Sequence, residues 1–378
     1  MRTWPPSVGL LLLLFFAFET NSAGAKKLKR SRRFYAKLNM TPECLQFING
    51  SCENRGLASH DALASGFVRM ACLGDFGNNL HQFIFARLIA ERLNFALDVC
   101  QKIHALIYTE YQLTLGLVFP NLRGISRIQP TKTVKQTLPT ERLGGHFSDL
   151  LNVTSNTAPR VIQVAGYPFS NYAFYQEYKD YIRGHLLVVN TSCVPWYQHT
   201  PQDDDVVIHL RSYNKCGHVA KTNPVHNPKG NRKFADTPVA YYENALENMR
   251  LRQDVKNIWL VSRCGMNDTV AILLQQKYGA KLSPHAQKPL QEFLFMQRAQ
   301  RLIIPASTFG WWAAYLSSAR EIHYPLFDSR WFGKKASFCL HPREDHYYYH
   351  TATDAGHTPS SHQKIRILAQ GRGDKCTW

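Results

Sequence analysis

The chain has 378 residues, of which 44% are hydrophobic, and a formal net charge of +18. Removal of seven of these charges, Arg2 and the six basic residues in 26–33, leaves +11 spread along the rest of the chain. A spread charge without zinc-finger spacing or an RNA-binding aromatic motif argues against a nucleic-acid partner. A basic groove for a phosphorylated small molecule explains the same sign. The length allows two lobes of ordinary domain size.

The N-terminus carries a short apolar run, Val8–Phe18, which is followed by the small residues 23–25. A membrane-spanning helix needs about 20 apolar residues, so this shorter run predicts a cleaved signal peptide at 1–25 more readily than a short anchor. Any membrane association would depend on this segment remaining uncleaved. Residues 26–65, which are basic, are predicted to form a stem.

Sequons and cysteines indicate a lumenal protein of the secretory pathway. The nine cysteines are consistent with disulfides in an oxidising compartment, with one cysteine left over. N-glycosylation is predicted at the five N-x-Ser/Thr sequons, which begin at Asn39, Asn49, Asn152, Asn190 and Asn267.

Residues 66–200 are predicted to form a first α/β lobe. The sequence is strand-like over Arg69–Leu73, and an apolar helical face begins after a turn that contains Gly77 and Asn78. Glycine at a strand-to-helix turn allows a ligand or another backbone to approach closely. Tight packing alone would also explain this glycine. A second strand is predicted over Val161–Ala165.

Residues 201–340 are predicted to form a second lobe. It opens with a buried strand, Val206–Leu210, which has His209 and Arg211 at its C-terminal end. In open α/β sheets the ligand binds at the carboxyl ends of the strands, where an arginine can hold a diphosphate through two parallel hydrogen bonds. His209 could instead be a satisfied core histidine. The strands and helices that follow alternate along the chain, which predicts a parallel sheet.

The segment 303–319, "IIPASTFGWWAAYLSSA", has the pattern of a strand, a loop and a helix. Ser307 and Thr308 are residue types that favour helix N-caps, and Trp311 and Trp312 follow inside the helix. This arrangement presents backbone N–H groups at a positive helix end, where a phosphate is stabilised. The alternative is that the hydroxyls are only caps and the tryptophans only core.

The acidic run Asp203–Asp205 matches the Asp-x-Asp metal site of glycosyltransferases that have a single nucleotide-binding domain. In such a site the carboxylates follow a hydrophobic strand, but here they precede one. We therefore expect a solvated strand entrance and no metal site.

Five segments, in the right order over residues 69–332, resemble the alpha-1,2-fucosyltransferase family. The most specific is "MQRAQRLIIPASTFGWWAAYL", which is similar to the MxxCxxxIIxNSTFSWWAAWL block of the family. "LGDFGNNLHQFIFAR" resembles the GxLGNQxFQYA opening, and "VVIHLRSY" resembles the HxRRGDY motif. "AGYPFSNYAFYQEYKDYIR" and "YYENAL" resemble two further segments.

The resemblance implies an α/β protein of two Rossmann-like lobes with parallel sheets and an interlobe cleft, a GT-B-like glycosyltransferase fold. It implies transfer of L-fucose from GDP-fucose to a glycan acceptor with inversion and without a metal or other cofactor. The expected location is the Golgi lumen, or outside the cell after secretion. Residues 66–200 would face the acceptor, 201–340 would bind the nucleotide-sugar donor, and 341–378 would be a C-terminal extension.

Carried over residue by residue, the resemblance makes Arg211 and Asn78 the catalytic residues. Arg211 would bind the donor diphosphate, and Asn78 would face the cleft near the reacting carbon. Trp311 and Trp312 would pack the donor helix into its own lobe. The donor-binding residues that it implies are Gly77, His209, Arg211, Ser307, Thr308 and Phe309.

Two departures from the family pattern affect donor identity. The second Arg and the Gly-Asp of the HxRRGDY motif are replaced by residues 212–214, and the family's Ser-Asp-Asp is Ser262-Arg263-Cys264 here. If the first Asp of that motif reads the N–H donors of guanine, Arg263 cannot do so. A glycosyltransferase for another nucleotide sugar and a catalytically inactive, secreted glycan-binding relative remain alternatives. The Arg-Gly-Asp triplet at 372–374 is too common a pattern to predict an adhesion ligand.

Overall fold

The computed structural model describes residues 66–70, 76–93, 95–98, 134–138, 160–164, 173–187, 199–211, 237–251, 254–286, 289–326 and 344–351. The predicted leader and stem lie outside these residues, as do residues 212–214. The same holds for the sequons at Asn39, Asn49, Asn152 and Asn190. Within the described part of the chain, no helix combines the length and apolar character that a membrane span requires.

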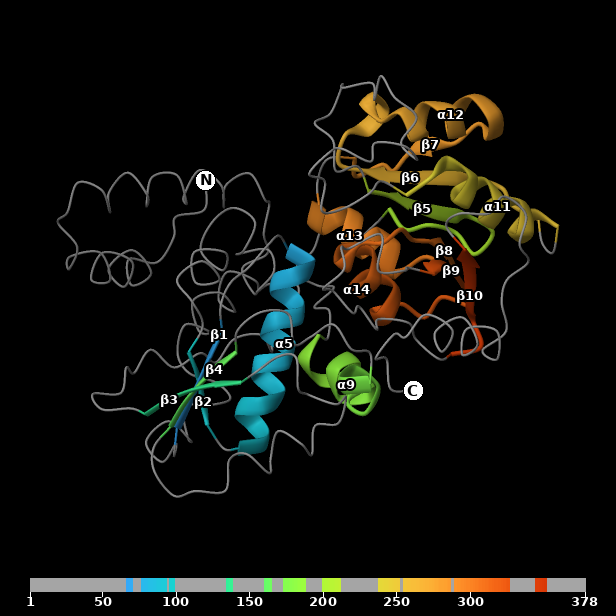
Figure 1. The fold of residues 1–378 in the computed structure, drawn as a ribbon. Helices are drawn as coiled ribbons and strands as arrows, with labels where there is room; N and C mark the ends of the chain where they lie inside the picture. The colour runs from blue at the N-terminus through green and yellow to red at the C-terminus, as the bar shows by residue number, and fades with distance from the viewer. Residues whose placement is uncertain are drawn as a thin grey trace, which may run out of the picture.

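The first lobe contains a parallel four-stranded sheet with the order β2-β1-β4-β3 (Figure 1). Its strands are β1 (Gly66–Met70), β2 (Ala96–Asp98), β3 (Val134–Leu138) and β4 (Arg160–Val164). Helix α5 (Phe76–Leu93) supplies the crossover that parallel neighbours such as β1 and β2 require. β4 lies within one residue of its predicted bounds, whereas β1 starts three residues earlier than predicted. Gly77 and Asn78 lie in the first turn of α5, not in a turn before it.

Helix α5 lies between the two lobes. Every residue from Leu80 to Ala90 is buried, so the helix is enclosed on all sides. One side covers β1 of its own sheet, and the other packs against α14 (Thr308–Leu316) of the second lobe (Figure 1). Helix α5 therefore supplies part of the contact between the lobes.

The second lobe contains a parallel six-stranded sheet with the order β10-β9-β8-β5-β6-β7. Its strands are β5 (Val206–Leu210), β6 (Ile258–Ser262), β7 (Lys281–Leu282), β8 (Arg301–Ile303), β9 (Glu321–Leu326) and β10 (Tyr347–Thr351). The chain passes outward from β5 to β6 and β7, then returns to β8 on the other side of β5. The boundary between β5 and β8 is therefore a topological switch point, outside which ligands bind in open α/β sheets.

Helices cover both faces of the second sheet. Alternate side chains of a strand point to opposite faces, so Val207 belongs to one hydrophobic core and Ile208 to the other. The helices of the Ile208 core are α11 (Val239–Arg250) and α12 (Thr269–Tyr278). Those of the Val207 core are α13 (Pro289–Gln297) and α14. Burial on both faces explains the continuous apolar run of β5, in which all five residues are buried.

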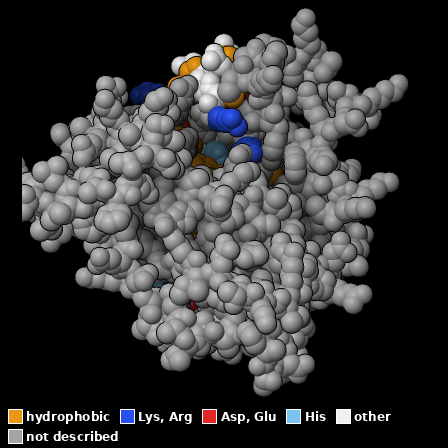
Figure 2. All heavy atoms as spheres, turned by 90° about the vertical axis from the view of Figure 1, so that its left-hand side faces the viewer, with side chains coloured by type: hydrophobic (Ala, Val, Ile, Leu, Met, Phe, Trp, Pro, Cys, Tyr) orange, Lys and Arg blue, Asp and Glu red, His pale blue; other side chains and the backbone are white. Residues whose placement is uncertain are grey.

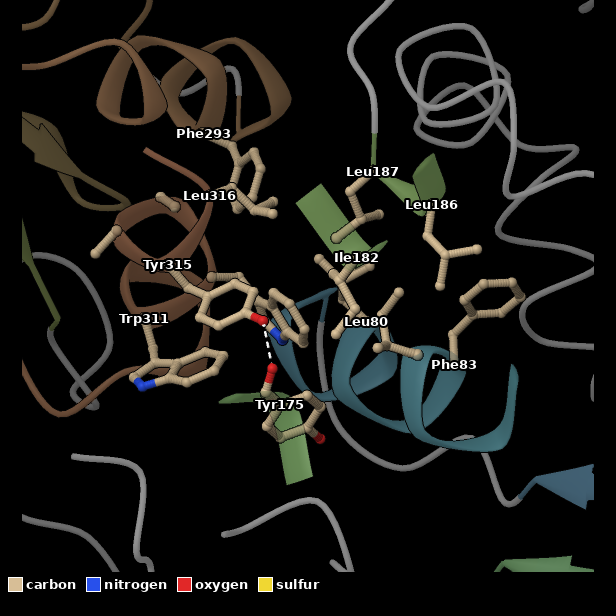
Figure 3. Packing of buried hydrophobic residues seen from close by; sticks show 14 of the residues in the cluster. Leu80, Phe83, Tyr175, Ile182, Leu186, Leu187, Phe293, Trp311, Tyr315 and Leu316 are labelled. Atoms are coloured by element: carbon tan, nitrogen blue, oxygen red, sulfur yellow. Dashed lines mark hydrogen bonds between the residues drawn. The ribbon is translucent and has the colours of Figure 1, made fainter. Parts of the chain in front are cut away.

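Residues 173–187, which we call the bridge segment, pack against both lobes. They form α9 (Ala173–Gln176), α10 (Lys179–Tyr181) and the π-helical turn η2 (Ile182–Leu186). Ile182 and Leu186 lie beside α5, and the Tyr315 hydroxyl of α14 donates to the Tyr175 carbonyl oxygen at 2.8 Å (Figure 3).

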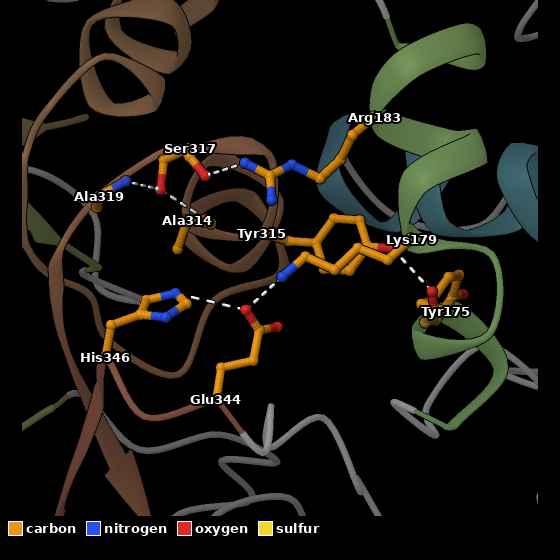
Figure 4. Close-up of polar contacts among 9 residues, drawn as sticks. All are labelled: Tyr175, Lys179, Arg183, Ala314, Tyr315, Ser317, Ala319, Glu344 and His346. Carbon is orange, nitrogen blue, oxygen red and sulfur yellow. Dashed lines mark hydrogen bonds and ion pairs between the residues drawn. The ribbon is translucent and has the colours of Figure 1, made fainter.

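Polar contacts also hold the bridge segment to the second lobe (Figure 4). Lys179 forms an ion pair with Glu344, which precedes β10, and Arg183 donates to the Ser317 carbonyl oxygen at the end of α14. A cation is favourable at a helix C-terminus because the carbonyl end carries partial negative charge. β10 comes from the segment 341–378 that the sequence assigns to an extension, so part of that segment belongs to the second sheet. Two parallel sheets with helices packed on them confirm the expected α/β class with two Rossmann-like lobes.

Candidate functional site

The residues predicted to bind a donor meet at the switch point of the second sheet. His209 is in β5, Arg211 follows that strand directly, and Ser307 follows the neighbouring strand β8. Ile208 of β5 pairs with Ile303 of β8, so the two strands end at the same edge of the sheet. The structure therefore brings Arg211 and the start of α14 to one edge.

Helices α5 and α14 begin at the same place. A Cβ atom on Gly77 would lie 2.5 Å from the backbone nitrogen of Phe309 and 2.7 Å from Thr308 Oγ1, so only glycine fits there. One turn further along both helices, the indole N–H of Trp312 donates to His81 Nδ1. From the first contact to the second, the chain moves four residues toward the C-terminus on both helices. The helices therefore run parallel, with their N-termini together.

This arrangement concentrates positive charge. A helix N-terminus is equivalent to about half an elementary charge, and two such ends side by side repel each other unless an anion lies between them. Neither helix has an acidic residue in its first turn, and the Ser307 side chain at the N-cap of α14 makes no capping hydrogen bond. The backbone N–H groups at the start of α14 are thus suited to a phosphate or diphosphate.

His209 lies against the first turn of α14 and is only 5% exposed. Its ring centroid is 5.4 Å from that of Phe309, and a Cβ on Gly310 would lie 2.5 Å from His209 Nδ1. Burial, and secondarily the charge of Arg211, lower the pKa of His209 to about 3. Nδ1 has no hydrogen-bond partner among the described residues. His209 is a neutral imidazole at the edge of the site.

Arg211 supplies the permanent positive charge of the site. It is half-buried at the end of β5, and its positive charge helps to lower the pKa of His209. A guanidinium can give two parallel N–H bonds to the oxygens of one phosphate. In Figure 2, Lys or Arg side chains and a histidine lie close together where described residues reach this face of the molecule.

Asn78 approaches the site from the first lobe. It is half-buried, and it follows Gly77, whose backbone touches α14. The Asn78 carbonyl oxygen accepts a hydrogen bond from Gln82 Nε2 at 3.1 Å, whereas the side-chain amide has no partner among the described residues. The amide can therefore donate to, or accept from, a bound molecule, but it cannot serve as a proton-accepting base.

Residues 160–338 match the model of glycosyl transferase family 11, the family of alpha-1,2-fucosyltransferases. The match covers 179 of the 378 residues, so it shows a likeness to this family over part of the chain. The protein is a glycosyltransferase that resembles the alpha-1,2-fucosyltransferases, as the sequence motifs predict. The match includes His209, Arg211 and Ser307, while Gly77 and Asn78 precede it.

Two solved structures show distant similarity to this glycosyltransferase. A mutant of Arabidopsis thaliana FUT1 in complex with GDP is 11% identical, with coverage of 81% of this chain and 80% of its own and a TM-score of 0.41. The glycosyl transferase family 9 structure from Veillonella parvula is 12% identical, with coverage of 83% and 94% and a TM-score of 0.36. No curated protein matches the chain.

The loop after β6 differs from the end of β5 in that its acidic side chain, Asp268, is hydrogen-bonded within the loop. Its carboxylate is used internally, because Asp268 accepts from the Val270 backbone N–H at 3.0 Å and contacts Ser262 Oγ at 3.2 Å. Cys264 is buried and disulfide-bonded. Arg263 is exposed and has no ion-pair partner among the described residues. Leu210 pairs with Ser262, so Arg211 and Arg263 follow adjacent strands.

The acidic run before β5 is a structural anchor. Asp205 is buried and accepts hydrogen bonds from Trp259 Nε1 and Asn257 Nδ2, both at 2.8 Å, and from the Gln202 backbone N–H at 3.0 Å. This carboxylate holds the entrance of the strand, so the expectation of a solvated entrance is wrong for Asp205, whose oxygens are taken up by three internal donors. In the described part of the chain, no three His, Cys, Asp or Glu side chains converge as a metal site would require.

The tryptophan pair of α14 has a role that sequence analysis did not identify. Trp311 and Trp312 are buried, but they pack across the lobe boundary against His81 of α5 and Tyr175 of the bridge segment. They share a core cluster with Val207 and Ile304 of their own lobe, as expected, but the expectation did not include the packing across the boundary. Helical periodicity marks the apolar face of a helix but does not say which element covers it. The one available signal was the position of His81, one turn after Gly77.

Proposed function

We propose that the protein transfers L-fucose from GDP-fucose to a glycan acceptor with inversion of the anomeric carbon and without a metal ion. In this reaction an acceptor hydroxyl oxygen forms a bond to the anomeric carbon as the bond to the donor phosphate breaks. GDP leaves with the electron pair, and the hydroxyl loses its proton. Negative charge therefore grows on the diphosphate in the transition state.

The observation that carries this proposal is the convergence of two helix N-termini beside Arg211. Fixed dipoles and a guanidinium stabilise charge on a leaving diphosphate without any reorganisation at the moment of reaction. Neutral His209 would add one N–H donor. Asn78, on the opposite lobe, would orient the acceptor hydroxyl or the sugar. In this proposal the residues of 66–200 face the acceptor and those of 201–340 hold the donor.

The β6 loop supports a specific proposal for how the base is recognised. Because Asp268 is engaged by its own loop, the free charged group beside Arg211 is the exposed Arg263. An arginine pairs well with the O6 and N7 acceptors of guanine, an edge that the family's Asp would not use. Uracil has no such edge, and adenine offers a donor in place of O6. A guanine nucleotide therefore suits this edge of the sheet even without the Asp.

The buried disulfide at Cys264 supports a lumenal, oxidising location for the enzyme, in the Golgi or after secretion. Asn267 is exposed at the end of the 3₁₀ turn η5 (Gly265–Asn267), as an N-glycan acceptor must be. Asn267→Gln should lower the apparent mass of protein secreted from a eukaryotic host by one glycan. An unchanged mass would mean that Asn267 is unmodified.

The test is a donor panel with purified secreted protein. GDP-fucose, GDP-mannose, UDP-galactose and UDP-N-acetylglucosamine are each incubated with a set of glycan acceptors, with and without EDTA, and the anomeric configuration of any product is read by NMR. We expect transfer only from GDP-fucose, inverted, and unaffected by EDTA. Transfer from a UDP-sugar would overturn the donor. Binding of GDP without any turnover would favour an inactive glycan-binding relative.

A further inference from the structure

We infer that His81 is a positioning residue of this enzyme: its Nδ1 holds the indole of Trp312 and thereby fixes the two helix N-termini against each other. The inference rests on the proposed function, because the site that it positions is the proposed diphosphate site. His81 does not contact the ligand. It acts through α5 and α14.

The chemistry of the pair fixes the state of the imidazole. An indole N–H can only donate, so in this pair His81 Nδ1 accepts and the ring proton is on Nε2, a nitrogen that is itself buried. The Gly77 carbonyl oxygen lies 3.0 Å from Nδ1. It cannot be the partner in this state, and it accepts the backbone N–H four residues further on, as helix geometry requires. Burial lowers the pKa of His81 to about 3, so the ring is neutral and one of its nitrogens can accept at neutral pH.

The position of His81 couples this bond to the site. Gly77 and His81 are four residues apart and share one face of α5, while Thr308 and Trp312 are four apart on α14. The first pair of contacts is the backbone approach at Gly77, and the second is the indole bond. Loss of the second contact would free the helices to slide or separate at the first. An unpaired indole N–H in this fully buried place would also destabilise the folded protein.

The surroundings make the bond specific. The His81 ring lies 4.8 Å from each of the Trp311 and Trp312 rings and 5.4 Å from Tyr175. An aromatic ring therefore fits at position 81 for packing alone, and the motif that this segment resembles has Phe there. Histidine adds one thing that Phe cannot supply, which is an acceptor for Trp312. Its selection over Phe is explained by the bond and not by volume.

The experiment compares three variants by steady-state kinetics with GDP-fucose and by affinity for GDP. His81→Phe keeps the ring and removes the acceptor, and we expect kcat to fall about 10-fold to 10²-fold, because a misplacement of about 1 Å can cost that much. His81→Asn should retain most of the turnover, because its amide oxygen lies near the position of Nδ1. The double variant His81→Phe/Trp312→Phe removes donor and acceptor together, and it should recover part of what either single change loses.

Leu274→Ala, which creates a cavity in the other core, controls for lost stability. It should lower the melting temperature and leave kcat unchanged, so a drop in kcat of folded His81→Phe would report position and not folding. Equal kcat and equal GDP affinity in His81→Phe and wild type would overturn the role of His81 alone. A wild type that neither binds GDP nor transfers fucose would overturn the proposed function. Loss in His81→Asn as large as in His81→Phe would show that the acceptor is not what matters.

Discussion

Helices α12 and α14 both follow strands of the same sheet, yet they begin in opposite ways. The N-cap of α12 is Asp268, whose carboxylate accepts from the Val270 N–H and contacts Ser262 Oγ. The N-cap of α14 is Ser307, whose side chain makes no capping bond. Instead, the N-terminus of α5 packs beside it through Gly77.

The difference separates a structural helix start from a functional one. At α12 the protein neutralises the positive helix end with its own carboxylate, and nothing remains for a ligand. At α14 it adds a second positive helix end, a neutral His209 and the charge of Arg211. Neither α5 nor α14 has an acidic residue in its first turn, so in the proposed function the neutralising anion at α14 is the donor diphosphate. Each experiment below would break or sharpen this contrast.

The largest effect is expected for Arg211→Lys. An ammonium keeps the charge but cannot give two parallel bonds to phosphate oxygens. Removal of one such donor typically costs about 10²–10³ in turnover, and we expect a loss of that size in kcat with little change in stability. Arg250→Lys, at the exposed end of α11, is the matched control and should leave both unchanged. Wild-type turnover by Arg211→Lys would remove Arg211 from the mechanism.

Gly77→Ala should be nearly as damaging, because the added Cβ would meet the backbone of α14 at 2.5 Å. Backbone cannot move aside as a flexible side chain can, so the two helix starts must separate. We expect about a 10²-fold loss of kcat and a fall of about 1–3 kcal/mol in the free energy of unfolding. Gly184→Ala is the control, since a Cβ there has no neighbour within 4 Å. Tolerance of alanine at 77 would mean that the helices do not meet in solution.

At the paired helix starts, the sequence predicted the residues around α14 better than the contact between α14 and α5. The bounds of β5 and the adjacency of His209 and Arg211 follow from a continuous apolar run, because a strand buried on both faces has no polar positions. The loop after β8 is likewise a local pattern. The bond between His81 and Trp312 joins residues 231 positions apart, and no local periodicity contains it. The sequence also could not show that the Asp268 carboxylate is hydrogen-bonded within its own loop.

Two of the buried histidines, His81 and His209, should make stability depend on pH. The pKa of His81 and of His209 is about 3 in the folded protein, against an ordinary value of 6.5. Between these values the unfolded chain binds protons that the folded protein cannot. The contribution of these histidines to the free energy of unfolding should therefore be at its maximum above pH 6.5. It should fall as the pH is lowered, by up to about 1.4 kcal/mol per pH unit for each histidine.

Urea unfolding at several values from pH 7 down to pH 5 measures this slope, above the range in which most carboxylates titrate. His81→Asn and His209→Asn should each flatten it, because asparagine does not titrate. A slope that neither substitution changes would mean that solvent reaches both rings, and the closed interface between α5 and α14 would then be wrong.

The smallest effects come from the two N-caps themselves, and they should fall on different quantities. Asp268→Ala removes the carboxylate that closes α12, so the free energy of unfolding should drop by about 1 kcal/mol while kcat stays at the wild-type value. Ser307→Ala removes a hydroxyl that makes no capping bond, so stability should stay within a few tenths of a kcal/mol. Its loss should instead raise KM for the donor about 5-fold, as expected for one hydrogen bond to a phosphate that is present in both ground and transition states. Chemical unfolding and donor kinetics on the same two preparations measure both quantities. If Ser307→Ala lost stability and kept the wild-type KM, Ser307 would be a structural N-cap like Asp268. The proposed difference between the two helix starts would then be wrong.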